Sequence, residues 1–239
     1  MIDPVQALGA ARESVVARIE AACSRVGREP SAVQLVAISK TVSLDVLRHA
    51  PAAGLHALGE NRVQEAADKA PGLPDVEWHL VGHLQGNKAA KALELFAVIQ
   101  SVDSVELAVR LARLAGERGR SEVPVYLQVN VDADPAKAGF GQDMLEGALE
   151  QVLALPALEV RGLMTVGLLT QLPEAARPTF VRLRHLSETL RGRYPALGAG
   201  LSMGMSDDVE VAVEEGSTLV RVGRAIFGAR PPVGQGPSG

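Results

Sequence analysis

The feature that most constrains this chain of 239 residues is a regular alternation of short apolar runs with longer helical patterns. β-Branched and other apolar residues form the runs, and apolar residues spaced three and four apart form the helical patterns. Strands are predicted at residues 33–39, 55–58, 77–81, 98–101, 123–131, 159–166, 199–203 and 219–222. Helices are predicted at residues 4–26, 43–49, 62–70, 88–95, 104–118, 144–153, 174–193 and 207–215. Ser43, Ser104 and either Ser206 or Asp207 stand where helix N-caps belong.

Eight strands, each but the last followed by a helix, fit an α/β fold, a (β/α)8 barrel of the TIM type with an extra N-terminal helix; such barrels have about 250 residues. An open doubly wound sheet is the alternative. That fold more often carries a glycine-rich dinucleotide turn after its first strand, and here the turn reads Ser39-Lys40-Thr41-Val42. We therefore predict one barrel domain over residues 1–230, followed by a Pro- and Gly-rich tail over 231–239 that is expected to be disordered.

Composition argues against several functional classes. A net charge of −4 and 3% aromatic residues disfavour a nucleic-acid surface, which needs cations for phosphates and rings for stacking. Cys23 is the single cysteine, so we expect neither disulfides nor a cysteine-based metal site. No apolar run reaches the roughly 20 residues of a membrane span, and the first residues lack the apolar core of a signal peptide. We expect a cytoplasmic protein, a monomer, with no nucleic-acid or membrane partner.

Polar residues and glycines gather at the carboxyl ends of the predicted strands, where barrels of this type place their active sites. Lys40 directly follows the first apolar strand. A lysine that leaves a hydrophobic core is partly desolvated, which lowers the pKa of its amine and frees it as a nucleophile or Schiff-base former. From position alone, an ordinary loop lysine is the alternative. The chain has five lysines against nineteen arginines, so each amine can be tested separately.

Two segments after the seventh and eighth strands suit a phosphate group. One leads into a helix through Ser202, Gly204 and Ser206, and the other is Gly223-Arg224. Exposed amides at such positions bind anions, and these barrels commonly hold a phosphate between the same two loops. Plain helix capping is the alternative for the serines. Together with the lysine, this cradle suits an aldehyde-bearing phosphate ester or a phosphosugar that forms an imine.

Arg221 lies within the apolar eighth strand, and a buried guanidinium needs an acceptor. A structural carboxylate such as Glu60 or Glu65 is one alternative, and a ring nitrogen or phosphate of a ligand is the other. His79 and His83 are four residues apart, as in some zinc sites. On a strand, however, that spacing is too long for one metal ion, and no third ligand is near. We therefore expect no metal site.

Several longer motifs occur together: AISKT (37–41), LGENRVQE (58–65), WHLVGHLQGNK (78–88), RGLM (161–164), LSMGMSDD (201–208) and VRVGRAIFG (220–228). In combination they resemble the pyridoxal-phosphate homeostasis proteins, single-domain relatives of the alanine racemase barrel. The resemblance runs from about residue 33 to residue 230. It implies a fold-type III pyridoxal-phosphate barrel, with pyridoxal 5′-phosphate held covalently as a Schiff base on Lys40.

The resemblance also implies roles for other residues. The implied cofactor-binding positions are Lys40, Asn61, His79, Met164, Ser202, Gly204, Arg221, Gly223 and Arg224. Among them, Ser202 and the Gly223-Arg224 amides match the phosphate cup, and Arg221 matches the arginine that approaches the pyridine nitrogen. The family often has threonine where this chain has Arg224, so one hydroxyl contact to the phosphate is lost here while the backbone amide remains.

The function implied by the resemblance is vitamin B6 homeostasis, as a carrier or buffer of pyridoxal phosphate with little or no catalysis. An arginine cannot accept a proton from the pyridine, so the ring stays a weak electron sink. Racemase relatives also use a tyrosine from a second domain, and Tyr126 and Tyr194 match no such position. Pyridoxal phosphate, and apo forms of enzymes that use it, are the partners implied.

Three alternatives remain open at this point. An amino-acid racemase or lyase needs a second acid/base opposite Lys40, for which His79 and His83 are the candidates. A class-one-type aldolase also uses a barrel lysine, although usually on a later strand and with an acid/base carboxylate. Lys137, in the loop after the fifth strand, faces the same end of the barrel and is either a transit amine for the aldehyde or a solvated charge.

Overall fold

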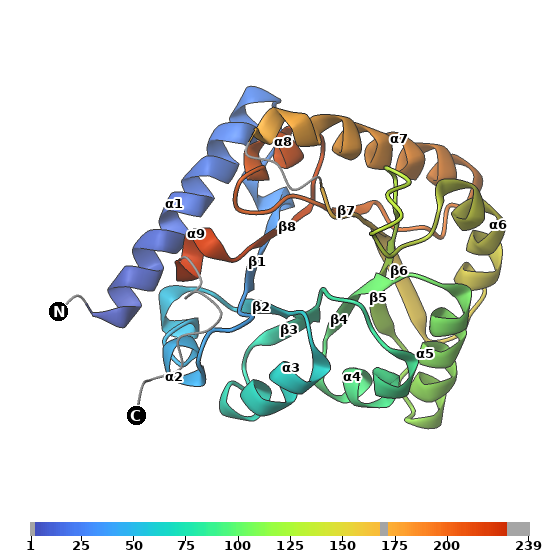
Figure 1. Cartoon of the computed structure of the whole chain (residues 1–239), viewed down its shortest axis with the longest axis horizontal. Helices are drawn as coiled ribbons and strands as arrows, with labels where there is room; N and C mark the ends of the chain where they lie inside the picture. The colour runs from blue at the N-terminus through green and yellow to red at the C-terminus, as the bar shows by residue number, and fades with distance from the viewer. Residues whose placement is uncertain (1–2, 168–171, 229–239) are drawn as a thin grey trace.

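The eight predicted strands close into one parallel barrel in the computed structural model, which describes residues 3–167 and 172–228 (Figure 1). Each strand pairs with its neighbour in sequence, and β8 pairs with β1 to complete the ring. The strands are β1 (Gln34–Ile38), β2 (Ala57–Glu60), β3 (Glu77–Leu80), β4 (Val98–Val102), β5 (Val123–Gln128), β6 (Leu158–Met164), β7 (Gly200–Ser202) and β8 (Leu219–Val222). The prediction of a (β/α)8 barrel is confirmed.

Helices surround the barrel, and α1 runs along its outside beside α8 and α9 (Figure 1). The α-helices are α1 (Pro4–Arg25), α2 (Leu44–Leu47), α3 (Val63–Lys69), α4 (Ala89–Leu95), α5 (Val105–Glu117), α6 (Gln142–Leu153), α7 (Arg177–Arg193), α8 (Val209–Glu214) and α9 (Arg224–Phe227). Short 3₁₀ helices lie in the connections: η1 (Pro30–Ala32), η2 (Pro51–Ala53), η3 (Ala70–Gly72), η4 (Gly86–Lys88) and η5 (Pro173–Ala176). Within the described ranges, no helix combines the length and apolar character that crossing a membrane requires.

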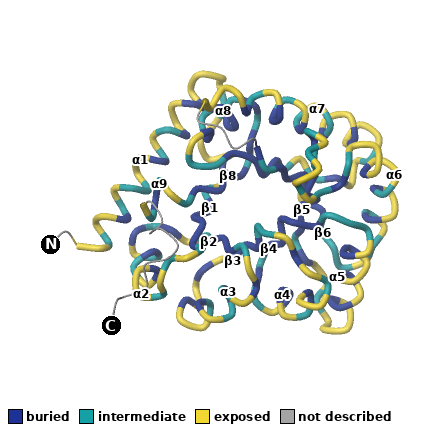
Figure 2. Tube along the Cα trace, in the orientation of Figure 1, coloured by how far each residue is buried: buried dark blue, intermediate teal, exposed yellow. Residues whose placement is uncertain are grey.

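Alternation of side chains along the strands divides the apolar core into two parts. The inner part fills the barrel and consists of Val36, Ile38, Val98, Tyr126, Met164 and Leu219. The larger, outer part lies between the barrel and the ring of helices. Figure 2 shows the consequence: the strands are buried, while the outward faces of the helices are exposed. The barrel interior is therefore packed, and its polar residues stand out against an apolar background.

The starts of three helices test the predicted N-caps. Ser104 caps α5 as predicted, because its hydroxyl accepts a hydrogen bond from the backbone N–H of Leu107 at 3.2 Å. Ser43 precedes α2, but its side chain makes no capping bond. The N-cap of α8 is Asp208, so the prediction of Ser206 or Asp207 is wrong by one or two residues.

Two further differences concern short segments. β5 ends at Gln128 rather than at residue 131, because the side chain of Asn130 bends the chain by donating to Asp134 O at 2.7 Å and accepting from Asp134 N at 3.1 Å. The four-residue helix α9 was not predicted, since one turn leaves no periodic pattern. The predicted tail over 231–239 lies outside the described residues.

Candidate functional site

Lys40 lies in a pocket at the carboxyl ends of β1 and β8, where the barrel fold predicts the site. The pocket has a volume of about 300 Å³. It is lined by Ile38, Lys40, Thr41, Val42, Ser43, Val46, Gly223, Arg224, Phe227 and Gly228. Lys40 is half-buried. Two predicted segments from opposite ends of the sequence thus meet, because β1 and β8 are hydrogen-bonded neighbours.

The backbone turn that carries Lys40 is braced by the β2–α3 unit. Thr41 has a φ of 66°, a left-handed conformation that is strained for a β-branched residue. The carboxylate of Glu65 accepts from Thr41 N at 3.3 Å, and the amine of Lys69 donates to Ser39 O at 2.9 Å. Both residues that flank the lysine are therefore held from α3.

A buried ion pair completes this brace. The amine of Lys69 lies 2.7 Å from Oε1 of Glu60, and the hydroxyl of Ser39 donates to the same oxygen at 2.7 Å. Burial raises the pKa of the fully buried Glu60 carboxyl, although the bonds from Lys69 and Ser39 oppose the shift. Glu65 also faces Lys69, at 3.8 Å. Glu60 and Glu65 therefore pair with Lys69, and the alternative in which one of them pairs with Arg221 is wrong.

A hydroxyl and backbone amides gather where β7 and β8 end. The backbone N–H of Ala225 donates to Ser206 Oγ at 3.4 Å, beside the pocket wall formed by Gly223 and Arg224. Gly204 has a φ of 96°, and a Cβ on it would lie 2.4 Å from the Cβ of Ala212. Only glycine therefore lets the chain turn here against α8 and place Ser206 next to α9.

Ser202 lies elsewhere than its predicted place in the phosphate cup suggests. It is fully buried, and its hydroxyl contacts Gln100 and Arg221 inside the barrel. The hydroxyl that contacts an amide of α9 belongs to Ser206. Arg224 is exposed, and its guanidinium pairs with the carboxylate of Asp207 at the surface. The contribution that the fold leaves to Arg224 at the pocket is therefore chiefly its backbone.

Arg221 lies on β8 and points into the barrel, two residues before Gly223, which follows the end of the strand. Nη1 donates to Ser202 Oγ at 2.5 Å and Nη2 donates to Thr165 O at 2.7 Å. Burial lowers the pKa of Arg221 to about 10, while the nearby Asp208 carboxylate opposes that shift. The guanidinium therefore remains charged at neutral pH. In the parts of the chain that are described, no ion pair links it directly to a carboxylate.

His79 is fully buried on β3, with both ring nitrogens engaged. Nδ1 lies 2.8 Å from Nε2 of Gln100, and Nε2 lies 2.6 Å from Oε1 of Glu77. Gln100 was not predicted as a site residue. Its signal in the sequence was an amide in the middle of the apolar strand VIQSV, which requires a polar partner inside the barrel.

The two other predicted positions, Asn61 and Met164, lie at the ends of β2 and β6. Asn61 follows β2 and is half-buried, and its backbone packs so closely on Gly82 that a Cβ there would lie 2.3 Å from Asn61 O. Met164 ends β6 and is fully buried in the inner core with Ile38 and Val36. Neither residue lines the Lys40 pocket.

The remaining candidates have partners of their own. The amine of Lys137 lies 3.3 Å from Oδ2 of Asp132 and donates to Val166 O at 3.1 Å. His83 is exposed, and its Nδ1 lies 2.8 Å from Oδ2 of Asp103. Across residues 3–167 and 172–228, no group of three or more metal-ligating side chains comes together.

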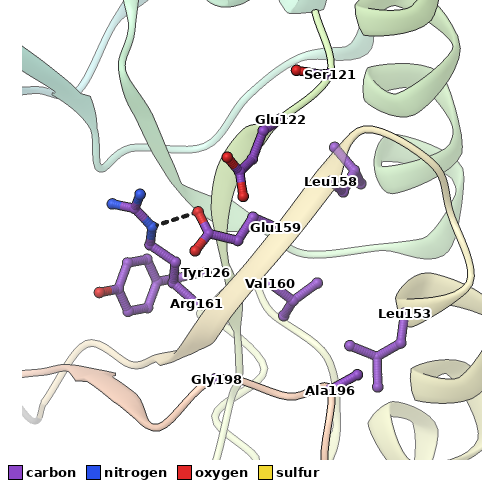
Figure 3. Close-up of a pocket in the computed structure, with 10 residues that line it drawn as sticks. All are labelled: Ser121, Glu122, Tyr126, Leu153, Leu158, Glu159, Val160, Arg161, Ala196 and Gly198. Atoms are coloured by element: carbon purple, nitrogen blue, oxygen red, sulfur yellow. Dashed lines mark hydrogen bonds and ion pairs between the residues drawn. The ribbon is translucent and has the colours of Figure 1, made fainter.

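A larger pocket of about 520 Å³ opens at the opposite, N-terminal mouth of the barrel. Figure 3 shows Glu159 and Arg161 joined across one face of β6, with the ring of Tyr126 beside the arginine. The pocket contains no lysine, and it lies at the other end of the strands from Lys40. Its size alone therefore does not make it the candidate site.

Comparisons with known proteins show the family of the chain. The family described as "Alanine racemase, N-terminal domain" matches residues 13–231. The pyridoxal phosphate homeostasis protein of Aquifex aeolicus (strain VF5) is 40% identical over 218 residues, covering 90% of this chain and 95% of that protein. The protein of the same name from Pseudomonas aeruginosa is 42% identical over 219 residues, covering 90% and 93%.

A solved structure extends the likeness to three dimensions. PipY of Synechococcus elongatus PCC7942, solved with pyridoxal phosphate bound, is 43% identical and superposes with a TM-score of 0.77, covering 88% of this chain and 99% of that chain. Both sequence and fold therefore match over nearly the full length of the relatives. The chain belongs to the pyridoxal phosphate homeostasis proteins, within the alanine racemase N-terminal domain family.

Proposed function

We propose that this protein binds pyridoxal 5′-phosphate as a Schiff base on Lys40 and serves in vitamin B6 homeostasis as a carrier or buffer with little or no catalysis. The observation that carries the proposal is a pocket that Lys40 shares with Gly223 and Arg224. The names of the relatives and the pyridoxal phosphate bound in PipY support it.

The groups around the pocket match the chemical groups of pyridoxal phosphate. The Lys40 amine suits the aldehyde, and the Ser206 hydroxyl with the amides after β8 suits the phosphate. The guanidinium of Arg221, one layer deeper, suits an unprotonated ring nitrogen, because it can only donate hydrogen bonds. A volume of about 300 Å³ is at the lower end of the range for small-molecule sites.

Reversible attachment would use the amine alone. The nitrogen of Lys40 would add to the aldehyde carbon with loss of water. Addition of water would then release the free aldehyde, and addition of another amine would carry it away as an imine of that amine, with the Lys40 amine regenerated in both cases. The brace around Ser39 and Thr41 holds the backbone of this turn, while the long lysine side chain supplies the reach. Such a site would store and release the cofactor with water as the other reactant and as the carrier of the protons.

The surroundings of Lys40 favour carriage over racemase or lyase chemistry. Such enzymes need a second acid/base opposite the lysine. Of the two histidines considered, His79 has both nitrogens bonded inside the barrel, and His83 is exposed and bonded to Asp103. The charged Arg221 would also keep the ring a weak electron sink. Carriage by a cytoplasmic monomer that supplies apo-enzymes is the role that we propose.

The test is the visible absorption spectrum after pyridoxal phosphate is added to the purified protein and excess is removed. We expect the wild type to show a yellow imine band that borohydride reduces to a secondary amine, and mass spectrometry to place the label on Lys40. Lys40→Ala should lose the band.

The matched control is Lys88→Ala, which removes an exposed amine outside the pocket and should keep the band. A band of equal strength in Lys40→Ala contradicts the proposed attachment site. If the loaded protein instead racemised L-alanine at about 1 s⁻¹ or faster, measured as loss of optical rotation, the result would support a racemase.

A further inference from the structure

A continuous chain of hydrogen bonds crosses the barrel beneath the candidate site. Arg221 Nη1 donates to Ser202 Oγ at 2.5 Å, and Ser202 Oγ donates to Gln100 Oε1 at 2.6 Å. Gln100 Nε2 lies 2.8 Å from His79 Nδ1, and His79 Nε2 lies 2.6 Å from Glu77 Oε1. The first four residues are buried, whereas Glu77 reaches the N-terminal mouth of the barrel. The chain thus joins β8, β7, β4 and β3.

The two ends of this chain determine the direction of every bond in it. A guanidinium only donates, so Ser202 accepts from Arg221 and has its proton available for Gln100. The oxygen of Gln100 is then occupied, and its amide nitrogen donates to His79 Nδ1. His79 must therefore carry its proton on Nε2, where the Glu77 carboxylate accepts it. All donors of this hydrogen-bonded chain therefore point from Arg221 toward Glu77.

This chain of hydrogen bonds also links two opposite charges, the Arg221 guanidinium and the Glu77 carboxylate. Arg221 is buried without a direct carboxylate partner in the described residues, an arrangement that is costly unless the charge is compensated. Polarised hydrogen bonds between a cation and an anion reinforce one another. The bond from His79 lowers the pKa of Glu77 to about 2, so Glu77 is a carboxylate at neutral pH. The negative end is therefore present whenever the positive end is.

Other groups at the N-terminal mouth favour the charged form of Glu77. Gln34 donates to its Oε1 at 3.2 Å, and the guanidinium of Arg161 contributes a favourable charge. Figure 3 shows Arg161 at this mouth together with Glu159, to which it is bonded at 2.7 Å, and Tyr126. Glu159 is thus a carboxylate at the same mouth that takes no part in the chain.

We infer that Gln100 and Glu77 are positioning residues: acting through His79 and Ser202, they hold the Arg221 guanidinium in the orientation that meets the ring nitrogen of the ligand. Two of the five N–H donors of Arg221 are used by Ser202 and Thr165, which fixes the plane of the guanidinium and the direction of its other donors. The inference rests on the proposed function, because it takes the acceptor to be the pyridine nitrogen of pyridoxal phosphate.

The test compares the dissociation constants of pyridoxal phosphate and its 1-deaza analogue, in which C–H replaces the ring nitrogen. The wild type should prefer pyridoxal phosphate by about tenfold, as expected for a hydrogen bond to a charged donor. Gln100→Leu interrupts the chain of hydrogen bonds and should reduce the preference for pyridoxal phosphate over the analogue to about twofold or less. Glu77→Gln keeps the shape but removes the charge, and should give an intermediate value. A general loosening of the barrel would weaken the binding of both ligands alike and leave the ratio of their dissociation constants unchanged.

Two control variants test whether the effect is specific to the hydrogen-bonded residues. Gln64→Leu makes the same substitution on the exposed face of α3, and Glu159→Gln neutralises the neighbouring carboxylate at the same mouth. Both should keep the wild-type preference. In the protein without ligand, ¹⁵N–¹H spectra of the imidazoles should show His79 as the neutral Nε2–H tautomer.

Each outcome decides the matter. A tenfold preference retained in Gln100→Leu overturns the inference, as does a His79 proton on Nδ1. If Gln100→Leu fails to fold, the surface variant Glu77→Gln provides the decision by the same ratio. A wild type that binds neither compound overturns the proposed function itself, whereas one that binds both equally overturns only the role of Arg221 and its chain.

Discussion

At the scale of single residues, the proposed phosphate contact depends on two nearby serines that have different partners, although neither lines the Lys40 pocket. Ser202 and Ser206 have the same chemistry and lie in one short motif. Ser202 is the last residue of β7, and its side chain points into the barrel. There its hydroxyl donates to Gln100 and accepts from Arg221. Ser206 lies past the turn at Gly204 and reaches the amide of Ala225. We therefore propose Ser206 for the phosphate contact, while Ser202 bonds the guanidinium of Arg221.

Ser206→Ala should weaken the binding of pyridoxal phosphate by about tenfold, because one hydrogen bond to a charged phosphate is lost. The affinity for pyridoxal, which lacks the phosphate, should stay within about twofold of the wild type. Titration of the imine absorbance with each compound measures both constants. Ser31→Ala, an exposed serine before β1, is the control and should change neither. Equal weakening of both compounds in Ser206→Ala contradicts the phosphate contact.

At the scale of elements, β2 and α3 act as one unit that presents Lys40. Lys69 reaches from α3 to Ser39 O and to Glu60, and Glu65 reaches to the backbone of Thr41. These contacts offset the strain of the left-handed Thr41. The buried pair of Lys69 and Glu60 therefore ties the end of the first βα unit to the second.

Lys69→Met should lower the free energy of unfolding by about 3–5 kcal/mol at pH 7, because it leaves the Glu60 carboxylate buried and unpaired. Urea unfolding followed by circular dichroism measures the change. The double variant Lys69→Met with Glu60→Leu should regain a large part of the loss, since no charge then remains in the interior. A double variant as unstable as the sum of the two single variants contradicts a direct pairing of the two side chains.

At the scale of the whole molecule, α1 covers the side of the barrel that carries the proposed phosphate site. It packs on α8 and α9, and Arg18 pairs with Glu210 of α8 through two bonds of 2.6 Å. Arg28, just after α1, donates to the carbonyls of Val213 and Ser217 at the end of α8. The extra N-terminal helix is thus part of the barrel's outer layer, and its apolar face belongs to the main core.

Ile19→Ala in α1 should destabilise the protein by about 2–5 kcal/mol, as buried isoleucine truncations do, because Ile19 is buried against this core. Glu13→Ala, on the exposed side of the same helix, should change stability by no more than about 0.5 kcal/mol. Urea midpoints with an unchanged m-value provide the comparison. A cost below about 0.5 kcal/mol for Ile19→Ala contradicts the role of α1 as part of the core.

Much of this architecture was predictable because its signals are local. The spacing of apolar residues marks strands and helices, and the eight repeats leave few closed arrangements. The position of Lys40 was predictable for the same reason: it directly follows an apolar run, and the carboxyl ends of the strands face one side of a barrel. The helix α9 and the early end of β5 were missed because one turn of helix and the loop bonds of Asn130 leave no periodic pattern.

By itself, the sequence determined the (β/α)8 barrel and the place of Lys40 at its carboxyl end, since both follow from residues that are neighbours along the chain. Only the tertiary structure decided the partners of Arg221, the different partners of Ser202 and Ser206, and the chain of hydrogen bonds through Gln100 to Glu77. Those contacts join strands that are distant in sequence. They depend on the register at which the ring closes, and a hydrogen bond of 2.5–2.8 Å tolerates little change in that register.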